Sequence, residues 1–265
     1  MAPVQVNGRR PPDRTSPYAE RIYHQWRWKK RLNPASLTHF ERKVYSQNGE
    51  DGILAEIFRR IGAGGKYAIE FGIEDGSECC TRNLFVQGWR GLMLEGSPAQ
   101  AKRAVERFGN NADVRVACEM MTAENIIDLF RRYGVPEAPD LLVIDIDGND
   151  YWVWRAILAA YRPRVVVIEY NARWIPPTDW VMPYDPNHRG SGDTYFGASL
   201  TSLVKLGTAH GYQLVTCDSA GVNASFIRDD EAGGEGFSRS GTVCYAPPGY
   251  GRGFGHPLRT SRPSA

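Results

Sequence analysis

Two short apolar segments that end in acidic residues constrain this chain most. Segment 67–77 (YAIEFGIEDGS) breaks into glycines and carboxylates, and segment 91–95 (GLMLE) follows with Glu95 at its end. Glycines at a turn between strand and helix let the backbone approach a ligand, because no Cβ intervenes. A carboxylate after the next strand can accept hydrogen bonds from both ribose hydroxyls, and Gly76 precedes Glu95 by close to the roughly 20 residues expected. Together the segments predict a bound nucleoside.

The glycine turn departs from the pattern that binds a diphosphate. A pyrophosphate needs bare backbone NH groups at a helix N-terminus. Between Gly72 and Gly76 stand Glu74 and Asp75, whose carboxylates would repel it. A cationic ligand without phosphate suits the turn better, and S-adenosylmethionine carries an ammonium, a sulfonium and a ribose. Glu70, at the end of the first strand, is expected to meet the methionine ammonium directly or through water. The competing interpretation is an ordinary turn with solvated acids.

Composition excludes several partners. The chain has 265 residues, 42% of them hydrophobic, which is enough for one α/β domain with extensions. Its net charge of +2 is too small to indicate nucleic acid or an anionic membrane as the main partner. The sequence shows neither a membrane-length apolar run nor a signal peptide. Five cysteines without CxxC spacing predict reduced thiols in a cytoplasmic protein.

Helical and strand patterns alternate through most of the chain. Ser46 is expected to cap a helix with apolar residues on one face, and further helices are expected at 124–133, 152–161 and 198–209. Strands are expected at about 67–71, 91–95, 113–118, 141–145, 165–169, 212–217 and 224–228. The runs 141–145 (LLVID) and 165–169 (VVVIE) are typical of central parallel strands covered on both faces. The pattern predicts an α/β fold, a Rossmann-like doubly wound sheet with a C-terminal antiparallel hairpin.

The two ends differ from the middle in composition. Residues 1–40 are rich in Arg, Pro and aromatics, which predicts an extension that caps the site, or an arm on a second subunit of a homodimer. The alternative is a partly ordered basic leader. Residues 41–245 form the expected catalytic domain, and 246–265 are predicted to be a flexible tail.

Acidic residues follow the fourth and fifth strands. Asp145 and Asp147 follow one strand, and Glu169 and Asn171 follow the next, so all four are expected to converge. Hard oxygen ligands of this kind suit Mg²⁺, which would hold two substrate oxygens and lower the pKa of a hydroxyl. Without a metal, Asp147 or Asp150 would act as a general base. Simple turn formation is the remaining alternative, because D-G and G-N-D favour turns.

A long polar and aromatic segment, 176–196, follows the fifth strand and is expected to overhang the site. His188 in this segment is a candidate proton acceptor, because its ordinary pKa is near neutrality; a solvated loop histidine is the alternative. The chain lacks the N-P-P-Y or D-P-P-Y element of many enzymes that methylate amino groups. Residues 145–148 (DIDG) stand at that position. This absence favours an oxygen acceptor.

The segments 45–54 (YSQNGEDGIL), 70–76 (EFGIEDG), 88–96 (GWRGLMLEG) and 145–148 (DIDG) resemble the FkbM-like branch of class I S-adenosylmethionine-dependent methyltransferases. The resemblance covers about residues 45–230. It implies a seven-stranded Rossmann-like sheet and methyl transfer, commonly to hydroxyls of sugars or natural products. It also implies a small-molecule acceptor. The acids after the fourth and fifth strands are similar in placement to the Mg²⁺ site of catechol O-methyltransferase-like enzymes, although Tyr170 separates Glu169 from Asn171.

The resemblance also assigns donor contacts. The residues implied at the S-adenosylmethionine site are Gln47, Asp51, Glu70, Gly72, Asp75, Gly76, Glu95, Gly96 and Asp145. Of these, Glu70, Gly72 and Gly76 line the methionine end, and Glu95 meets the ribose. Two other functions remain open at this point. One is an NAD(P)-dependent oxidoreductase on a related fold, and the other is a non-catalytic subunit that binds S-adenosylmethionine.

Overall fold

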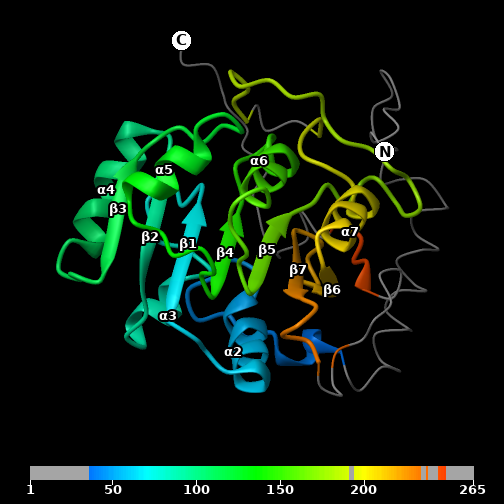
Figure 1. The fold of residues 1–265 in the computed structure, drawn as a ribbon, viewed down its shortest axis with the longest axis horizontal. Helices are drawn as coiled ribbons and strands as arrows, with labels where there is room; N and C mark the ends of the chain where they lie inside the picture. Colours follow the sequence, from blue (N-terminus) through cyan, green and yellow to red (C-terminus); the bar gives the residue numbers. More distant parts are fainter. Residues whose placement is uncertain (1–35, 191–193, 234–236, 238–243, 249–265) are drawn as a thin grey trace, which may run out of the picture.

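Seven strands form one mixed sheet in the order β3-β2-β1-β4-β5-β7-β6 (Figure 1). The computed structural model describes residues 36–190, 194–233, 237 and 244–248. β1 to β5 are parallel, and β7 is antiparallel to both β5 and β6. The strands are β1 (Tyr67–Phe71), β2 (Arg90–Glu95), β3 (Val114–Cys118), β4 (Leu141–Ile144), β5 (Val165–Glu169), β6 (Tyr212–Cys217) and β7 (Asn223–Arg228). The predicted doubly wound sheet with its antiparallel hairpin is confirmed.

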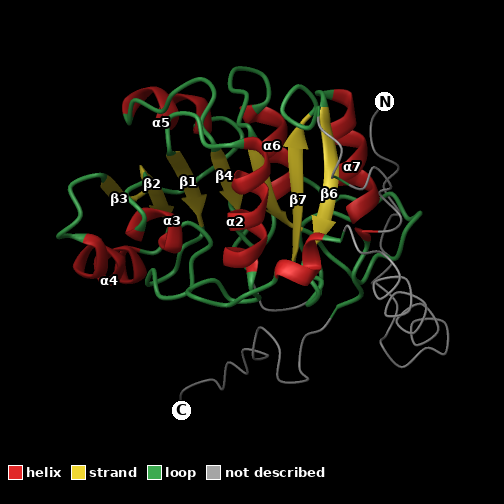
Figure 2. Cartoon of the chain, turned by 90° about the horizontal axis from the view of Figure 1, so that it is seen from below, coloured by secondary structure: helices red, strands yellow, loops and turns green. Residues whose placement is uncertain are grey.

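Helices cover both faces of the sheet (Figure 2). The 3-10 helix η1 and the helices α2 to α7 are η1 (Leu37–Phe40), α2 (Glu50–Ile61), α3 (Arg82–Val86), α4 (Pro98–Phe108), α5 (Ile126–Arg132), α6 (Asp150–Ile157) and α7 (Leu200–Ala209). Apolar residues of α5, α6 and α7 share one buried cluster with the sheet. Those of η1, α2, α3 and α4 share a second cluster. We call the side of the sheet that carries the second cluster the α2 face.

Strand alternation decides which side chains reach the α2 face. Every residue of β4 and β5 is buried, as expected of parallel strands covered on both sides. Successive side chains point to opposite faces, so Val166 and Ile168 contact the α5–α7 cluster while Val165 and Val167 contact the α2 cluster. Glu169 comes two residues after Val167 and therefore points to the α2 face.

The same alternation places three more polar residues on the α2 face. Glu70 follows Ala68 by two positions, and Glu95 follows Met93 by two; both apolar residues belong to the α2 cluster. Asn223 begins β7 and pairs in register with Glu169, so the two side chains share a face. Because β7 is antiparallel, its first residue lies beside the carboxyl ends of the parallel strands. We call this side of the sheet the carboxyl edge.

The first long helix starts later than the sequence indicates. Ser46 does not occupy its N-cap: α2 begins at Glu50, and Gly49 at the cap position has φ 97°. The Oγ of Ser46 nevertheless accepts a hydrogen bond from the backbone NH of Asp51, at 3.0 Å. Residues 46–49 therefore form a loop in front of the helix rather than its first turn.

The expected domain limits need adjustment at both ends. Leu37 is 1% exposed and belongs to the α2 cluster, so η1 is part of the domain and not of an extension. Ala246 is fully buried, and its carbonyl accepts a hydrogen bond from the Tyr170 hydroxyl, so the predicted tail cannot begin there. Most of the predicted extension, residues 1–35, and of the predicted tail, 249–265, lies outside the described residues.

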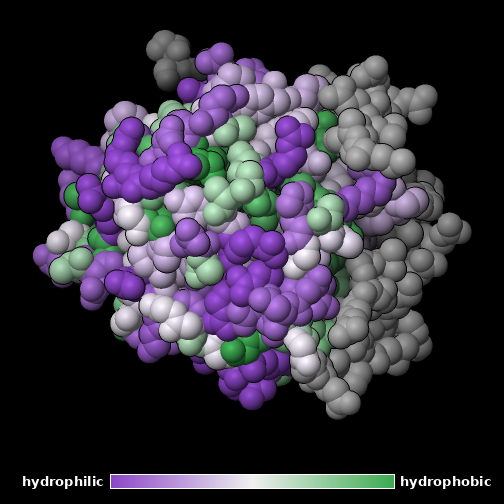
Figure 3. Space-filling view, viewed as in Figure 1, coloured by the Kyte–Doolittle hydropathy of each residue, from purple (hydrophilic) through white to green (hydrophobic). Residues whose placement is uncertain are grey.

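The surface over the described residues is mixed in character. In the view of Figure 3, hydrophilic side chains predominate and apolar ones form small groups between them. Within the described ranges, no helix combines the length and the apolar character needed to cross a bilayer.

Candidate functional site

The carboxyl edge gathers the acidic residues that the sequence singled out. In open α/β sheets, ligands bind beyond the carboxyl ends of the strands. Glu70 is the next-to-last residue of β1. Glu95 is the last residue of β2 and Glu169 the last of β5, while Asp145 follows β4 directly. These acids fall into two groups. Glu70 and Glu95 belong to what we call the β1–β2 half, and Asp145 and Glu169 belong to the β4–β5–β7 half; the carboxylates of the two halves differ in their hydrogen-bond partners.

In the β1–β2 half, Glu70 organises the loop that follows its strand. Its carboxylate accepts hydrogen bonds from the backbone NH of Cys80 at 2.8 Å and of Thr81 at 2.9 Å, and also from the Thr81 hydroxyl. The side chain is buried, and burial raises its pKa to about 7 despite these donors. Glu70 thus holds the entry to α3, a role that the sequence did not predict.

Glu95 connects two loops in a similar way. One carboxylate oxygen accepts from the backbone NH of Glu74 at 2.8 Å, and the other accepts from that of Ser97 at 2.7 Å. Burial raises the pKa of this carboxyl, against the effect of hydrogen bonds from the backbone NH groups of Ser97, Glu74 and Gly96. A carboxylate has about four acceptor positions, so these donors leave acceptor capacity for another partner. Glu95 therefore anchors the glycine turn and retains the capacity to bind a ribose.

The glycines of the turn are required by packing within the protein. Gly72 has φ 69°, and a Cβ there would lie 1.6 Å from the carbonyl oxygen of Asp145. Gly76 has φ 75°, and its Cβ would meet the Phe108 ring at 2.6 Å. At Gly96 the atom met is the sulfur of Met120, at 2.3 Å. Packing within the protein is therefore one reason for these glycines, and the close approach of a ligand stays a prediction.

Asp75 faces away from this group of acids and toward α4. Its Oδ1 accepts from the backbone NH of Ser77 at 2.9 Å, and its Oδ2 lies 3.0 Å from the guanidinium of Arg107. The Ser77 hydrogen bonds, with smaller contributions from Arg107, lower the pKa of Asp75. Its predicted role at the donor is therefore corrected to one in the turn.

Asp51 is committed to the loop before α2. Its Oδ2 accepts from the backbone NH groups of Val44, Tyr45 and Ser46, at 2.7 to 2.9 Å. The residue is 2% exposed. Asp51 consequently shapes the loop that carries Gln47, which is half-buried, while its Oδ1 is buried without a hydrogen-bond partner among the described residues.

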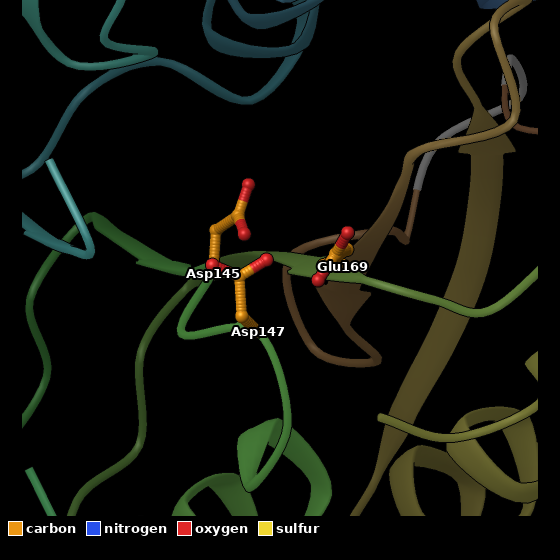
Figure 4. A group of neighbouring side chains, drawn as sticks. All are labelled: Asp145, Asp147 and Glu169. Carbon is orange, nitrogen blue, oxygen red and sulfur yellow. The ribbon is translucent and has the colours of Figure 1, made fainter. Parts of the chain in front are cut away.

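In the β4–β5–β7 half, three carboxylates converge. Asp145, Asp147 and Glu169 each offer an oxygen, and these oxygens all lie within 4.8 Å of one another (Figure 4). Asp147 has φ 55°, in the left-handed region, which places it on a tight turn after β4. Burial, and then the repulsion between neighbouring carboxylates, raise the pKa values of Asp145 and Glu169. Three acidic side chains are thus gathered here, and none forms an ion pair with a described Lys or Arg.

Asn171 does not belong to this cluster. Its Nδ2 donates to the carbonyls of Thr194 and Phe196, at 3.0 and 3.1 Å, and its Oδ1 accepts from the NH of Arg173. The side chain is 1% exposed and closes the long loop after β5. The predicted role of Asn171 as a metal ligand is corrected to a contact within this loop. Strand alternation would align Asn171 with Glu169, but β5 ends at Glu169, so the alignment does not extend to Asn171.

Asp150 lies beneath the turn rather than at its surface. It is fully buried at the start of α6, and its two oxygens accept from the backbone NH groups of Ile146 and Gly148, both at 2.9 Å. Burial raises its pKa to about 6. A base must contact the acceptor, so Asp150 is corrected from a catalytic candidate to a residue that shapes the 145–148 turn.

His188 reaches the turn from the long loop after β5. Its Nε2 lies 3.0 Å from the carbonyl oxygen of Asp147. A Cβ on Gly148 would clash with the imidazole at 2.3 Å, so the glycine makes room for the ring. His188 and Asp147 are therefore neighbours, as the sequence predicted only in general terms.

Two residues at this edge escaped the sequence interpretation. Glu50, at the start of α2, is 3% exposed and accepts hydrogen bonds from Nδ2 of Asn48 at 3.3 Å and Nδ2 of Asn223 at 2.9 Å. Glu50 stands within segment 45–54, so a signal for it existed. For Asn223 the sequence offered none, because only the return of β7 brings it beside Glu169.

Comparisons with known proteins found likeness to solved structures alone. No protein-family model and no curated protein matches the chain. Among solved structures, the mitomycin 7-O-methyltransferase MmcR is 18% identical, with a TM-score of 0.39, and the match covers 81% of this chain and 69% of that one. A putative O-methyltransferase from Klebsiella pneumoniae is 16% identical, with a TM-score of 0.43 and coverages of 82% and 91%. The CurJ carbon methyltransferase is 8% identical, with a TM-score of 0.44, and this chain spans 57% of its length.

The strand order itself defines the fold class. A sheet ordered β3-β2-β1-β4-β5-β7-β6, with β7 antiparallel to its neighbours, is the class I methyltransferase fold that the sequence predicts. The fold alone does not fix donor or acceptor. Both depend on the residues of the carboxyl edge.

Proposed function

We propose that this protein transfers a methyl group from S-adenosylmethionine to a hydroxyl of a small molecule, of sugar or natural-product type. One observation carries the proposal. Glu70, Glu95, Asp145 and Glu169 gather at the carboxyl edge, and none of them forms an ion pair with a described Lys or Arg. Uncompensated carboxylates favour a cationic ligand and oppose a diphosphate. A sulfonium nucleoside meets both conditions.

The donor is expected to lie across the β1–β2 half. Glu95 keeps acceptor positions for the ribose hydroxyls beside its bonds to Glu74 and Ser97. Glu70 lies near the place expected for the methionine ammonium. Burial raises its pKa to about 7, and a cation bound beside it would favour the ionised form. The β4–β5–β7 half, next in the sheet, then faces the methyl group.

The cluster of Asp145, Asp147 and Glu169 fits a divalent cation. Its oxygens lie within 4.8 Å of one another, and Oε2 of Glu169 is buried without a hydrogen-bond partner in the described part of the chain. Carboxylate oxygens are the ligands that Mg²⁺ prefers. Bound Mg²⁺ would hold the acceptor oxygen and lower the pKa of its hydroxyl.

The chain's own residues supply alignment and a proton acceptor. The acceptor oxygen attacks the methyl carbon as the bond from that carbon to sulfur breaks, and the electron pair stays on sulfur, giving S-adenosylhomocysteine. The hydroxyl proton passes to Asp147, which is exposed, or to His188 beside it. Holding the reacting atoms in line is the main contribution expected of the protein.

Titration calorimetry tests the donor assignment. The protein is expected to bind S-adenosylmethionine and S-adenosylhomocysteine, and not NADH. Binding of NADH without a response to either methyl-donor compound would replace the proposal with the oxidoreductase alternative. Binding of the donor with no turnover on any hydroxyl compound would favour the non-catalytic subunit. Assays in EDTA, and then with added Mg²⁺, test the cation: full activity in the chelator would remove it from the reaction.

A further inference from the structure

Asn223 stands beside the carboxylate cluster although it comes from a distant part of the chain. It is the register partner of Glu169 across β5 and β7. The neighbouring pair, Tyr170 and Val222, is joined by a backbone hydrogen bond of 2.9 Å, so the pair of Glu169 and Asn223 is a non-hydrogen-bonded one. Side chains of such pairs lie closest together, with Cα atoms about 4.5 Å apart. Both side chains point to the α2 face.

The amide of Asn223 is held in one orientation. Its Nδ2 donates to Oε1 of Glu50 at 2.9 Å, and Glu50 is itself fixed by Asn48, whose backbone NH donates to Oε2 at 2.9 Å. With Nδ2 committed to a carboxylate, Oδ1 is the atom left for another partner. The carboxylate of Glu50 therefore sets which end of the amide is available.

Two oxygen atoms of this pair lack the partners that burial requires. Oδ1 of Asn223 and Oε2 of Glu169 are both buried, and neither accepts a hydrogen bond from a described residue. Each side chain is only 5% exposed. Burying an oxygen without a donor costs on the order of 1–3 kcal/mol. Two adjacent orphaned acceptors indicate a ligand that supplies positive charge to both.

We propose that Asn223 provides, through Oδ1, the fourth protein ligand of a divalent cation held by Asp145, Asp147 and Glu169. The inference rests on the proposed cation site and extends it to β7. A carboxamide oxygen is a normal ligand for hard cations, and it adds a ligand without adding negative charge to an already acidic cluster. Glu50 then acts as a positioning residue, which fixes the amide without touching the cation.

Mn²⁺ binding, followed by electron paramagnetic resonance, tests the proposal without any assay of activity. Asn223→Ala is expected to weaken Mn²⁺ binding by about 10-fold or more, and Glu50→Gln by about 10-fold, as seen for residues that orient ligands. The matched control is Ser225→Ala, which removes another buried polar group from the same face of β7 and should leave affinity unchanged.

A diffraction experiment supplies a readout that no folding defect can imitate. Crystals of the wild-type protein soaked in Mn²⁺ are expected to show an anomalous peak within coordination distance, about 2.0–2.3 Å, of Asp145, Asp147, Glu169 and Oδ1 of Asn223. A peak on the three carboxylates but away from Asn223, or full affinity in Asn223→Ala, would overturn this inference and leave the cation site intact. A wild-type protein that binds no Mn²⁺ would remove both, while donor binding by calorimetry would still decide the proposed function.

Discussion

Glu70 and Glu95 at the ends of β1 and β2 accept hydrogen bonds on both carboxylate oxygens, whereas Glu169 at the end of β5 leaves one oxygen without a partner. All three are buried acids on the α2 face of the same sheet. The first two receive backbone NH groups because glycine-containing loops fold back over them. The third lies beside Asp145 and Asp147 and is the register partner of Asn223.

This difference separates acids bound by the protein's own donors from acids of the proposed cation site. A carboxylate with several NH donors is stabilised by the protein itself and keeps its loop in place. A buried carboxylate oxygen without a donor carries a cost of burial that a cation or a proton would offset. The β1–β2 half therefore forms a fixed frame, and the β4–β5–β7 half holds the groups available for chemistry.

Asp147→Asn should have the largest effect, on turnover. Asp147 is the exposed member of the open cluster, so its loss removes a proton acceptor and a cation ligand together. We expect turnover to fall by about 10²–10⁴-fold, the usual contribution of such groups. Donor affinity, measured by calorimetry, should stay close to that of the wild type. The control is Asp128→Asn, at an exposed acid on α5. An equal loss of turnover in both variants would contradict the assignment of the β4–β5–β7 half to chemistry.

Glu70→Gln tests whether burial or hydrogen bonding decides the ionisation state of Glu70. The folded pKa of Glu70, about 7, lies above its ordinary 4.5, so the folded state binds more protons between these values. The stabilisation by Glu70 is therefore complete below about pH 4.5 and is lost as pH rises to about 7, with a total on the order of 3 kcal/mol. Urea unfolding of the wild type and the variant should show a stability difference that shrinks over this range. A difference independent of pH would mean that the three donors keep Glu70 ionised.

Glu95→Gln should weaken donor binding while also loosening the frame. Glutamine offers one acceptor oxygen in place of two, so one of the NH groups of Glu74 and Ser97 loses its partner. We expect S-adenosylmethionine affinity to fall by about 10-fold and the free energy of unfolding by about 1–3 kcal/mol. The exposed Glu74→Gln, in the same loop, is the control. Unchanged donor affinity in Glu95→Gln would show that this half is only structural.

Asp75→Asn should have the smallest effect. Its partner Arg107 and Asp75 itself are both about one-third exposed, and such surface pairs contribute between about 0 and 1 kcal/mol. Donor affinity is expected to be unchanged, because the carboxylate faces α4. A marked loss of affinity by calorimetry would place the donor on the α4 side of the turn. It would contradict the placement of the donor beside Glu70 and Glu95.

Local patterns in the sequence were sufficient for the fold. The unbroken apolar runs of β4 and β5 predict buried parallel strands, since only strands covered on both faces need no polar residue. An acid at the end of such a run must lie at the carboxyl edge. Glu95, Asp145 and Glu169 could therefore be placed together from their positions along the chain.

The use of each acid depended on contacts that local patterns do not encode. Asp150 and Asp147 stand in the same acidic segment, yet one is buried beneath backbone NH groups and the other is exposed. Asn171 was predicted at the cluster from its distance to Glu169, but the end of β5 releases it to the following loop.

The sequence by itself determined the sheet, its covered strands and the edge where the acids lie, because side-chain periodicity and burial act over a few residues. Only the tertiary structure decided which acids keep free oxygens and that Asn223 faces Glu169. Those outcomes follow from the antiparallel return of β7 and from loops that donate NH groups across the edge, and both join residues far apart in the chain.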